Sequence, residues 1–118
     1  TEIPRAYVAA DLLVLPSDAG ETWGLVVNEA MACGRPAVVS DLVGCSEDLI
    51  EEGETGWRYP CGDVGALALL LGEAANRREH VAGMGAKAQR RVIEGYSVAK
   101  CVKETVRACG FGIRKWRR

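Results

Sequence analysis

Short apolar runs alternate along this chain with longer segments in which apolar residues recur at helical spacing. Three runs are too short for helices and predict buried strands at residues 12–15, 37–39 and 57–59. The remaining patterned segments predict helices at residues 3–10, 24–33, 46–52, 64–75, 79–94 and 98–109. Strands that alternate with helices indicate an α/β fold with a parallel sheet covered by helices on both faces.

Turn-forming and capping residues set the expected limits of these elements. Gly34 is predicted to end the second helix, Asp63 and Ser97 to cap later helices, and Gly110 to end the last one. We therefore expect one domain over residues 1–109, followed by a basic tail over 110–118. Three strands make a partial sheet, so its free edge should face sequence upstream of this chain.

Composition is that of an ordinary globular domain of 118 residues. The chain begins with Thr1 rather than methionine, which predicts a piece of a longer protein. No signal peptide or membrane-spanning run is recognised. Five cysteines without a C-x-x-C pair, together with one histidine, predict free and mostly buried thiols and no metal site. Free thiols fit a reducing compartment, so we expect a cytoplasmic protein.

The formal net charge of -1 conceals two halves of opposite sign. Residues 1–60 hold three basic and eleven acidic residues, whereas residues 61–118 hold twelve basic and five acidic ones. The basic residues follow helical patterns, and solvated helix faces are the favoured interpretation. Peripheral contact with an anionic membrane is the alternative, and the tail R-K-W-R-R at 114–118 would suit an interfacial anchor.

The candidate site lies where the predicted strands end. Ligands of open α/β sheets bind beyond the carboxyl ends of the strands, where residues 16–23 and 40–45 form loops. Both loops lead into helix starts, whose unpaired N–H groups can hold anionic or hydroxyl oxygens. We expect such groups at Gly24, Leu25 and Val26, and also at Gly44 and Cys45 on the neighbouring loop.

Two carboxylates, Glu21 and Glu29, bracket the start of the predicted helix, with seven residues between them. Ionised carboxylates accept hydrogen bonds from vicinal hydroxyls, as acidic residues do for ribose in dinucleotide-binding folds. A nucleotide-sugar site is one interpretation of the pair. The other is that the spacing arises by chance and that one of the glutamates is an ordinary residue on the helix surface.

A longer pattern resembles a known family. The stretch L-P-S-D-A-G-E-T-W-G-L-V-V-N-E-A-M-A-C-G-R-P-A-V-V-S at 15–40 is similar to the core signature of group 1 (family 4) retaining glycosyltransferases of the GT-B fold. Further ordered matches are Y-V-A-A-D at 7–11, S-D-L-V-G at 40–44, G-E-T-G-W at 53–57, P-C-G-D at 60–63 and Tyr96 with Ser97. The resemblance covers about residues 4–109 and implies a partial Rossmann-like sheet, the C-terminal part of a donor-binding domain.

The resemblance also implies roles for individual residues. Glu21 would be the catalytic acid that contacts the donor sugar near the reacting centre. The backbone amides of Trp23, Gly24 and Leu25 would hold sugar hydroxyls or the diphosphate, and Glu29 would accept from the ribose hydroxyls. The implied reaction transfers a sugar from a nucleoside diphosphate sugar with retention of anomeric configuration. It implies no metal and no cofactor besides this donor.

Two departures from the family pattern bear on these expectations. The second loop has Gly44-Cys45-Ser46-Glu47-Asp48 where the family often has Gly-Gly and then Pro-Glu, so Asp48 is the aligned acid. The basic pair that holds the pyrophosphate, and the domain that would bind a glycan or lipid-linked acceptor, belong upstream. The isolated chain is therefore expected to be inactive.

We expect no nucleic-acid partner. Two alternatives to a glycosyltransferase remain open. One is another GT-B enzyme, such as a sugar-nucleotide epimerase or a phosphorylase; no lysine stands near Glu21 for the phosphate-bound cofactor of the latter. The other is a non-catalytic fragment that binds a nucleotide sugar or packs against a partner.

Overall fold

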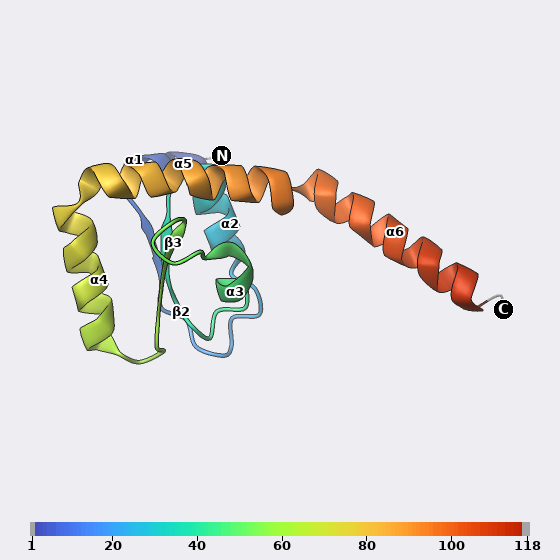
Figure 1. Ribbon diagram of the computed structural model, residues 1–118, viewed down its shortest axis with the longest axis horizontal. Helices are drawn as coiled ribbons and strands as arrows, with labels where there is room; N and C mark the ends of the chain where they lie inside the picture. The colour runs from blue at the N-terminus through green and yellow to red at the C-terminus, as the bar shows by residue number, and fades with distance from the viewer. Residues whose placement is uncertain (1, 117–118) are drawn as a thin grey trace.

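The computed structural model describes the backbone of residues 2–116 and the side chains of residues 2–111. Its elements are α1 (Ile3–Ala9), β1 (Leu13–Leu15), α2 (Leu25–Ala32), β2 (Ala37–Ser40), α3 (Ser46–Leu49), β3 (Gly56–Tyr59), α4 (Val64–Asn76), α5 (Arg78–Gly95) and α6 (Val98–Trp116). The three strands form one parallel sheet in the order β1-β2-β3. The predicted α/β fold is thus confirmed, and α6 extends away from the body that encloses the sheet (Figure 1).

Two apolar cores lie on opposite faces of this sheet. The first joins β2 to α2, α3 and α5 and consists of Val27, Met31, Ala37, Val39, Val43, Cys45, Leu49, Ile50, Ala88 and Val92. The second joins the sheet to α4 and the start of α5 and consists of Val38, Trp57, Tyr59, Ala74, Val81 and Met84. Helices therefore cover both faces, as parallel strands require.

Strand β2 is buried at every position, but β1 is only half-buried. The prediction that the first strand is buried on both faces is therefore wrong. Within the described residues β1 pairs with β2 alone, so it forms an edge of the sheet. The edge position agrees with the expectation of a free edge, and it keeps the end of β1 close to the surface.

The predicted helix end at Gly34 and the predicted cap at Asp63 are present. Gly34 follows α2 in the left-handed region, at φ 74°. An Asp63 carboxylate oxygen accepts from the Ala66 N–H at 2.8 Å and caps α4. Helix α3 ends at Leu49, short of the predicted residue 52.

The predicted end of the last helix at Gly110 is wrong, because α6 continues to Trp116. Apolar residues keep helical spacing at positions 102, 106, 109, 113 and 116. A glycine costs a helix only about 1 kcal/mol relative to alanine, so two of them need not end it. Arg117 and Arg118, the last residues of the expected basic tail, lie outside the described residues.

The cysteines are less buried than expected. Only Cys45 is fully buried; Cys33 and Cys61 are partly exposed, and Cys101 and Cys109 lie exposed on α6. The small size of a cysteine side chain made burial the expected outcome, but α6 projects away from the core and exposes its thiols.

Across residues 2–116, no helix is both long and apolar enough to cross a bilayer.

Candidate functional site

The loops that follow β1 and β2 are locked together at the carboxyl end of the sheet. The Cys45 N–H donates to the Trp23 carbonyl oxygen at 2.8 Å. Gly44 lies so close to the first loop that a Cβ there would be 2.7 Å from the carbonyl carbon of Thr22. Glycine is therefore needed at position 44 for the approach of the two backbones.

Gly24 joins the first loop to α2. It is buried and adopts the left-handed conformation at φ 92°, which glycine reaches without a steric cost. A Cβ at this position would lie 2.9 Å from the Val43 side chain and 3.1 Å from that of Leu15. The start of α2 is thus fixed between the end of β1 and the second loop.

Glu21 lies half-buried in this loop and folds back onto the helix start. Its Oε1 accepts from the Gly24 N–H at 3.0 Å. The N–H groups of Leu25 and Val26 have no acceptor among the described residues, as expected for a first helical turn. Of the amides suggested by the sequence, those of Gly24 and Cys45 are engaged within the chain, and those of Leu25 and Val26 are open.

Glu29 is exposed further along α2. Its Oε2 accepts from the hydroxyl group of Tyr7 at 2.8 Å. Burial and this hydrogen bond raise the pKa of Tyr7 to about 12, so the phenol is a neutral donor at physiological pH. The sequence analysis missed Tyr7 as a site residue, although it begins the Y-V-A-A-D match.

The Trp23 side chain supports the loops. Its indole Nε1 donates to Asn28 Oδ1 at 2.7 Å, and its ring lies against Tyr96 with the centroids 6.1 Å apart. The Tyr96 hydroxyl group donates to the Asp48 backbone oxygen at 3.1 Å, which connects the end of α5 to α3. The indole of Trp23 therefore has a structural role, because it links the first loop to α2 and to Tyr96.

The Cys45 thiol is a packing group. Burial raises its pKa to about 11, and the negative charges of Glu21 and Asp48 add to this rise. A thiol with this pKa is protonated at neutral pH and is a poor nucleophile.

The described residues contain no cluster of three or more His, Cys, Asp or Glu side chains that could hold a metal ion.

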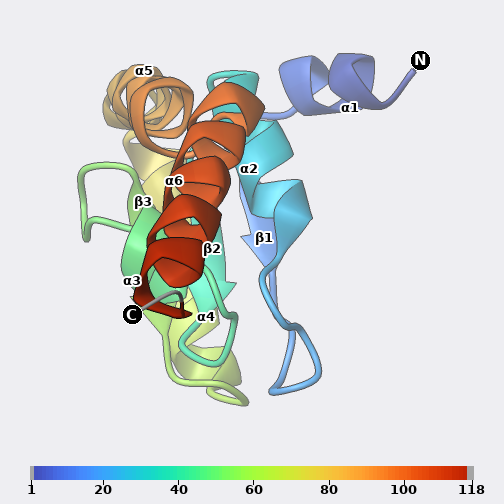
Figure 2. The same cartoon turned by 90° about the vertical axis from the view of Figure 1, so that its right-hand side faces the viewer.

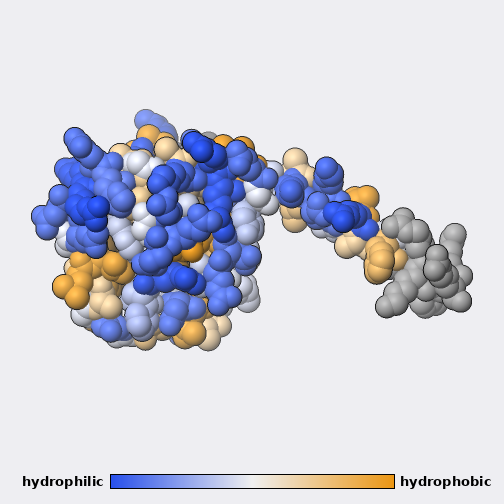
Figure 3. Space-filling model, viewed as in Figure 1, coloured by the Kyte–Doolittle hydropathy of each residue, from blue (hydrophilic) through white to orange (hydrophobic). Residues whose placement is uncertain are grey.

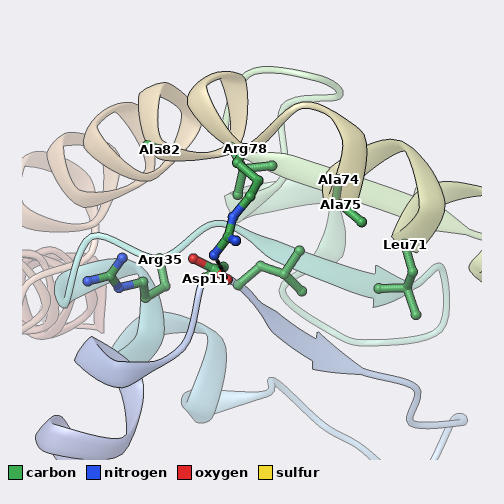
Figure 4. A pocket seen from close by; sticks show the side chains of 9 residues that line it. Asp11, Arg35, Leu71, Ala74, Ala75, Arg78 and Ala82 are labelled. Atoms are coloured by element: carbon green, nitrogen blue, oxygen red, sulfur yellow. Dashed lines mark hydrogen bonds and ion pairs between the residues drawn. The ribbon is translucent and has the colours of Figure 1, made fainter.

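A cavity of about 440 Å³ lies at the opposite end of the sheet, before β1 and β2 begin (Figure 4). Small apolar residues of α4 and α5 form much of its wall, and an ion pair joins Arg78 to Asp11 across it at 3.0 Å. Arg35 also lines it, with its Nε buried and unpaired in the described part of the chain. The two expected acids are not among its lining residues, so this cavity and the candidate site are separate.

The surface of the body is mostly hydrophilic in the view of Figure 3, with apolar side chains gathered over α4. Val64 and Leu69 on this helix are 76% and 77% exposed. At the carboxyl end of the sheet, Glu21 and the open N–H groups of Leu25 and Val26 offer hydrogen-bonding groups to a polar ligand.

Comparisons with known proteins identify the family of this chain. The family model described as glycosyl transferases group 1 matches residues 1–91. The chain is 41% identical over 90 residues to the phosphatidyl-myo-inositol mannosyltransferase of Mycobacterium leprae, covering 73% of this chain and 24% of that protein. It spans about a quarter of the length of this relative.

Solved structures show the same fold. The crystal structure of Anabaena HepE in complex with UDP superposes with a TM-score of 0.85 at 27% identity, over 93% of this chain and 30% of that one. Sucrose-phosphate synthase from Thermosynechococcus elongatus gives a TM-score of 0.78 at 30% identity, over 92% and 27% of the two chains. These neighbours have the GT-B fold. The chain belongs to the group 1 glycosyl transferases.

Proposed function

We propose that this chain supplies the donor-binding part of a longer, retaining glycosyltransferase of family 4. The enzyme would transfer a sugar from a nucleoside diphosphate sugar to an acceptor bound by sequence outside this chain. Structures of HepE in complex with UDP and with UDP-glucose support a nucleotide-sugar donor for this fold. A glycan or a lipid-linked molecule is the proposed acceptor.

The observation that carries the proposal is Glu21 held at the start of α2 beside two open amides, with Glu29 four residues after Leu25 on the same helix. Glu21 is held at the helix start by the Gly24 N–H, at 3.0 Å. The N–H groups of Leu25 and Val26 supply hydrogen-bond donors and the positive end of the helix dipole for sugar or phosphate oxygens. Glu29 lies further along α2, where it can accept from ribose hydroxyls.

In the proposed reaction Glu21 is the catalytic residue, and its carboxylate contacts the donor sugar near the anomeric carbon. The leaving diphosphate gains charge as the bond to the sugar breaks, and preorganised donors stabilise that charge. Two open amides do not neutralise a diphosphate, and the first half of the chain is strongly acidic. We therefore expect cations from outside this chain to complete the site, and the isolated chain to bind donors without transferring the sugar.

Ligand-observed NMR on the chain tests donor binding. The panel is UDP, GDP and ADP with their common sugar conjugates, and the variants are Glu29→Gln and, as a matched control, Glu104→Gln on α6. We expect saturation transfer to the ribose protons that is lost in Glu29→Gln and retained in Glu104→Gln. A folded chain that shows no transfer with any nucleotide, or transfer that Glu29→Gln leaves intact, would contradict a donor site at α2.

A further inference from the structure

Helix α1 packs against α2 (Figure 2). The hydrogen bond from Tyr7 to Glu29 joins them, although the two residues are 22 positions apart in the sequence. We propose that Tyr7 is a positioning residue for Glu29, which fixes one carboxylate oxygen so that the other can accept from the ribose of the donor. This inference rests on the proposed function of the site.

The need for a positioning group follows from the exposure of Glu29. A glutamate on a helix surface samples several rotamers, and binding a ligand must fix one of them. A phenol that donates to one oxygen of the carboxylate removes much of this freedom before the ligand arrives. Preorganisation of this kind improves affinity without any new contact to the ligand.

Tyr7 can do this because its own freedom is restricted. Its ring is half-buried, and a tyrosine side chain has only two rotatable angles. Arg35, which follows α2 in the chain, donates from Nη2 to the backbone oxygen of Val8 at 3.0 Å. This second link ties α1 to the segment that follows α2, so two hydrogen bonds restrain the phenol beside the carboxylate.

The hydrogen bond leaves Glu29 with capacity for a ligand. An ionised carboxylate has about four lone-pair positions, and Tyr7 uses one of them on Oε2. Among the described residues Tyr7 is the one side chain that hydrogen-bonds this carboxylate. Oε1 therefore remains for the two vicinal hydroxyls of a ribose.

Calorimetric titration with two matched probes tests the role. UDP carries both ribose hydroxyls, and 2′,3′-dideoxy-UDP has the same base and diphosphate without them. We expect Tyr7→Phe to weaken UDP binding about threefold to tenfold, as the loss of one hydrogen bond predicts, and to leave dideoxy-UDP binding unchanged. A merely structural role for Tyr7 would weaken both probes alike, and this result would overturn the proposal.

A double-mutant cycle separates this inference from the proposed function. In a Glu29→Gln background the further change Tyr7→Phe should have little effect on UDP binding, because the carboxylate it positions is gone. If Glu29→Gln weakens UDP binding and Tyr7→Phe leaves it equal or tighter, the positioning role fails alone. If the wild-type chain does not bind UDP, or Glu29→Gln changes nothing, the proposed function fails and the inference fails with it.

Discussion

A methyl group at position 44 has no room between the two loops of the candidate site. In Gly44→Ala the new Cβ would lie 2.7 Å from the carbonyl carbon of Thr22, closer still to the carbonyl oxygen, and 3.1 Å from the Cα of Trp23. Ordinary contacts of this kind are about 3.5–4.0 Å, so the loops must separate by roughly 0.8 Å or more. The obstacle is backbone, which cannot rotate aside as a flexible side chain would.

The cost of this change has two parts. Overpacking of a fitted interior costs about 1–3 kcal/mol, and separating the loops weakens the Cys45–Trp23 backbone hydrogen bond, worth about 0.5–1.5 kcal/mol. Alanine also lowers the conformational entropy of the unfolded chain, which offsets about 0.4–1 kcal/mol of this loss of stability. We expect a net loss of about 1.5–3 kcal/mol in the free energy of unfolding. Nucleotide affinity should fall as well, because the loop that moves carries Glu21.

Urea unfolding followed by tryptophan fluorescence measures this loss. With an m-value of about 1.5 kcal/mol/M, the midpoint for Gly44→Ala should fall by about 1–2 M. The matched control is Gly72→Ala on the exposed surface of α4, where an added Cβ meets nothing within 4 Å. This variant should be stabilised by about 0.5–1 kcal/mol. Equal midpoints for Gly44→Ala and the wild type, with ligand binding intact, would refute the packing of the two loops.

Three further predictions concern the rest of the chain. Asp63→Ala removes the cap of α4 and should cost about 0.5–2 kcal/mol in urea unfolding; an unchanged midpoint would argue against the cap. Alkylation at pH 8 should modify Cys101 and Cys109 quickly and Cys45 only after unfolding, because burial raises the pKa of Cys45 to about 11. Mass spectrometry of peptides measures the order of modification, and early modification of Cys45 would contradict its burial. The raised pKa of Tyr7, about 12 against an ordinary 10.0, favours the neutral phenol in the folded chain, so its stabilisation is complete below about pH 10 and is lost as the pH rises towards 12. A difference titration of the ultraviolet absorbance against Tyr7→Phe should show this midpoint, and one near 10 would disprove the shift.

Signals local in the sequence predicted most of the fold. The three strands lie where short apolar runs predicted them, and Gly34 and Asp63 end and begin helices as expected. Such signals suffice because turn and cap geometry depends on residues a few positions away. One error arose where the outcome depends on distant segments, because β1 is half-buried as an edge of the sheet. The other was local, because Gly110 was given more weight than the helical pattern that continues past it.

For the candidate site, the sequence predicted the positions of the acids along the chain but not their contacts. Spacing along the chain placed Glu21 before α2 and Glu29 on it. It did not show that Glu21 accepts from the Gly24 N–H, since that depends on the rotamer of one side chain. Nor did it show the role of Tyr7, because the contact with Glu29 depends on how α1 packs against α2.

The central claim is that a nucleotide sugar binds at the carboxyl end of the sheet, around the start of α2. Amide chemical shifts of the ¹⁵N-labelled chain, titrated with UDP and UDP-glucose, test it most directly. We predict shifts that grow with ligand concentration at Gly24, Leu25 and Val26. Shifts confined to the cavity of Asp11 and Arg78 at the other end of the sheet, or no shifts in a folded chain, would contradict the claim.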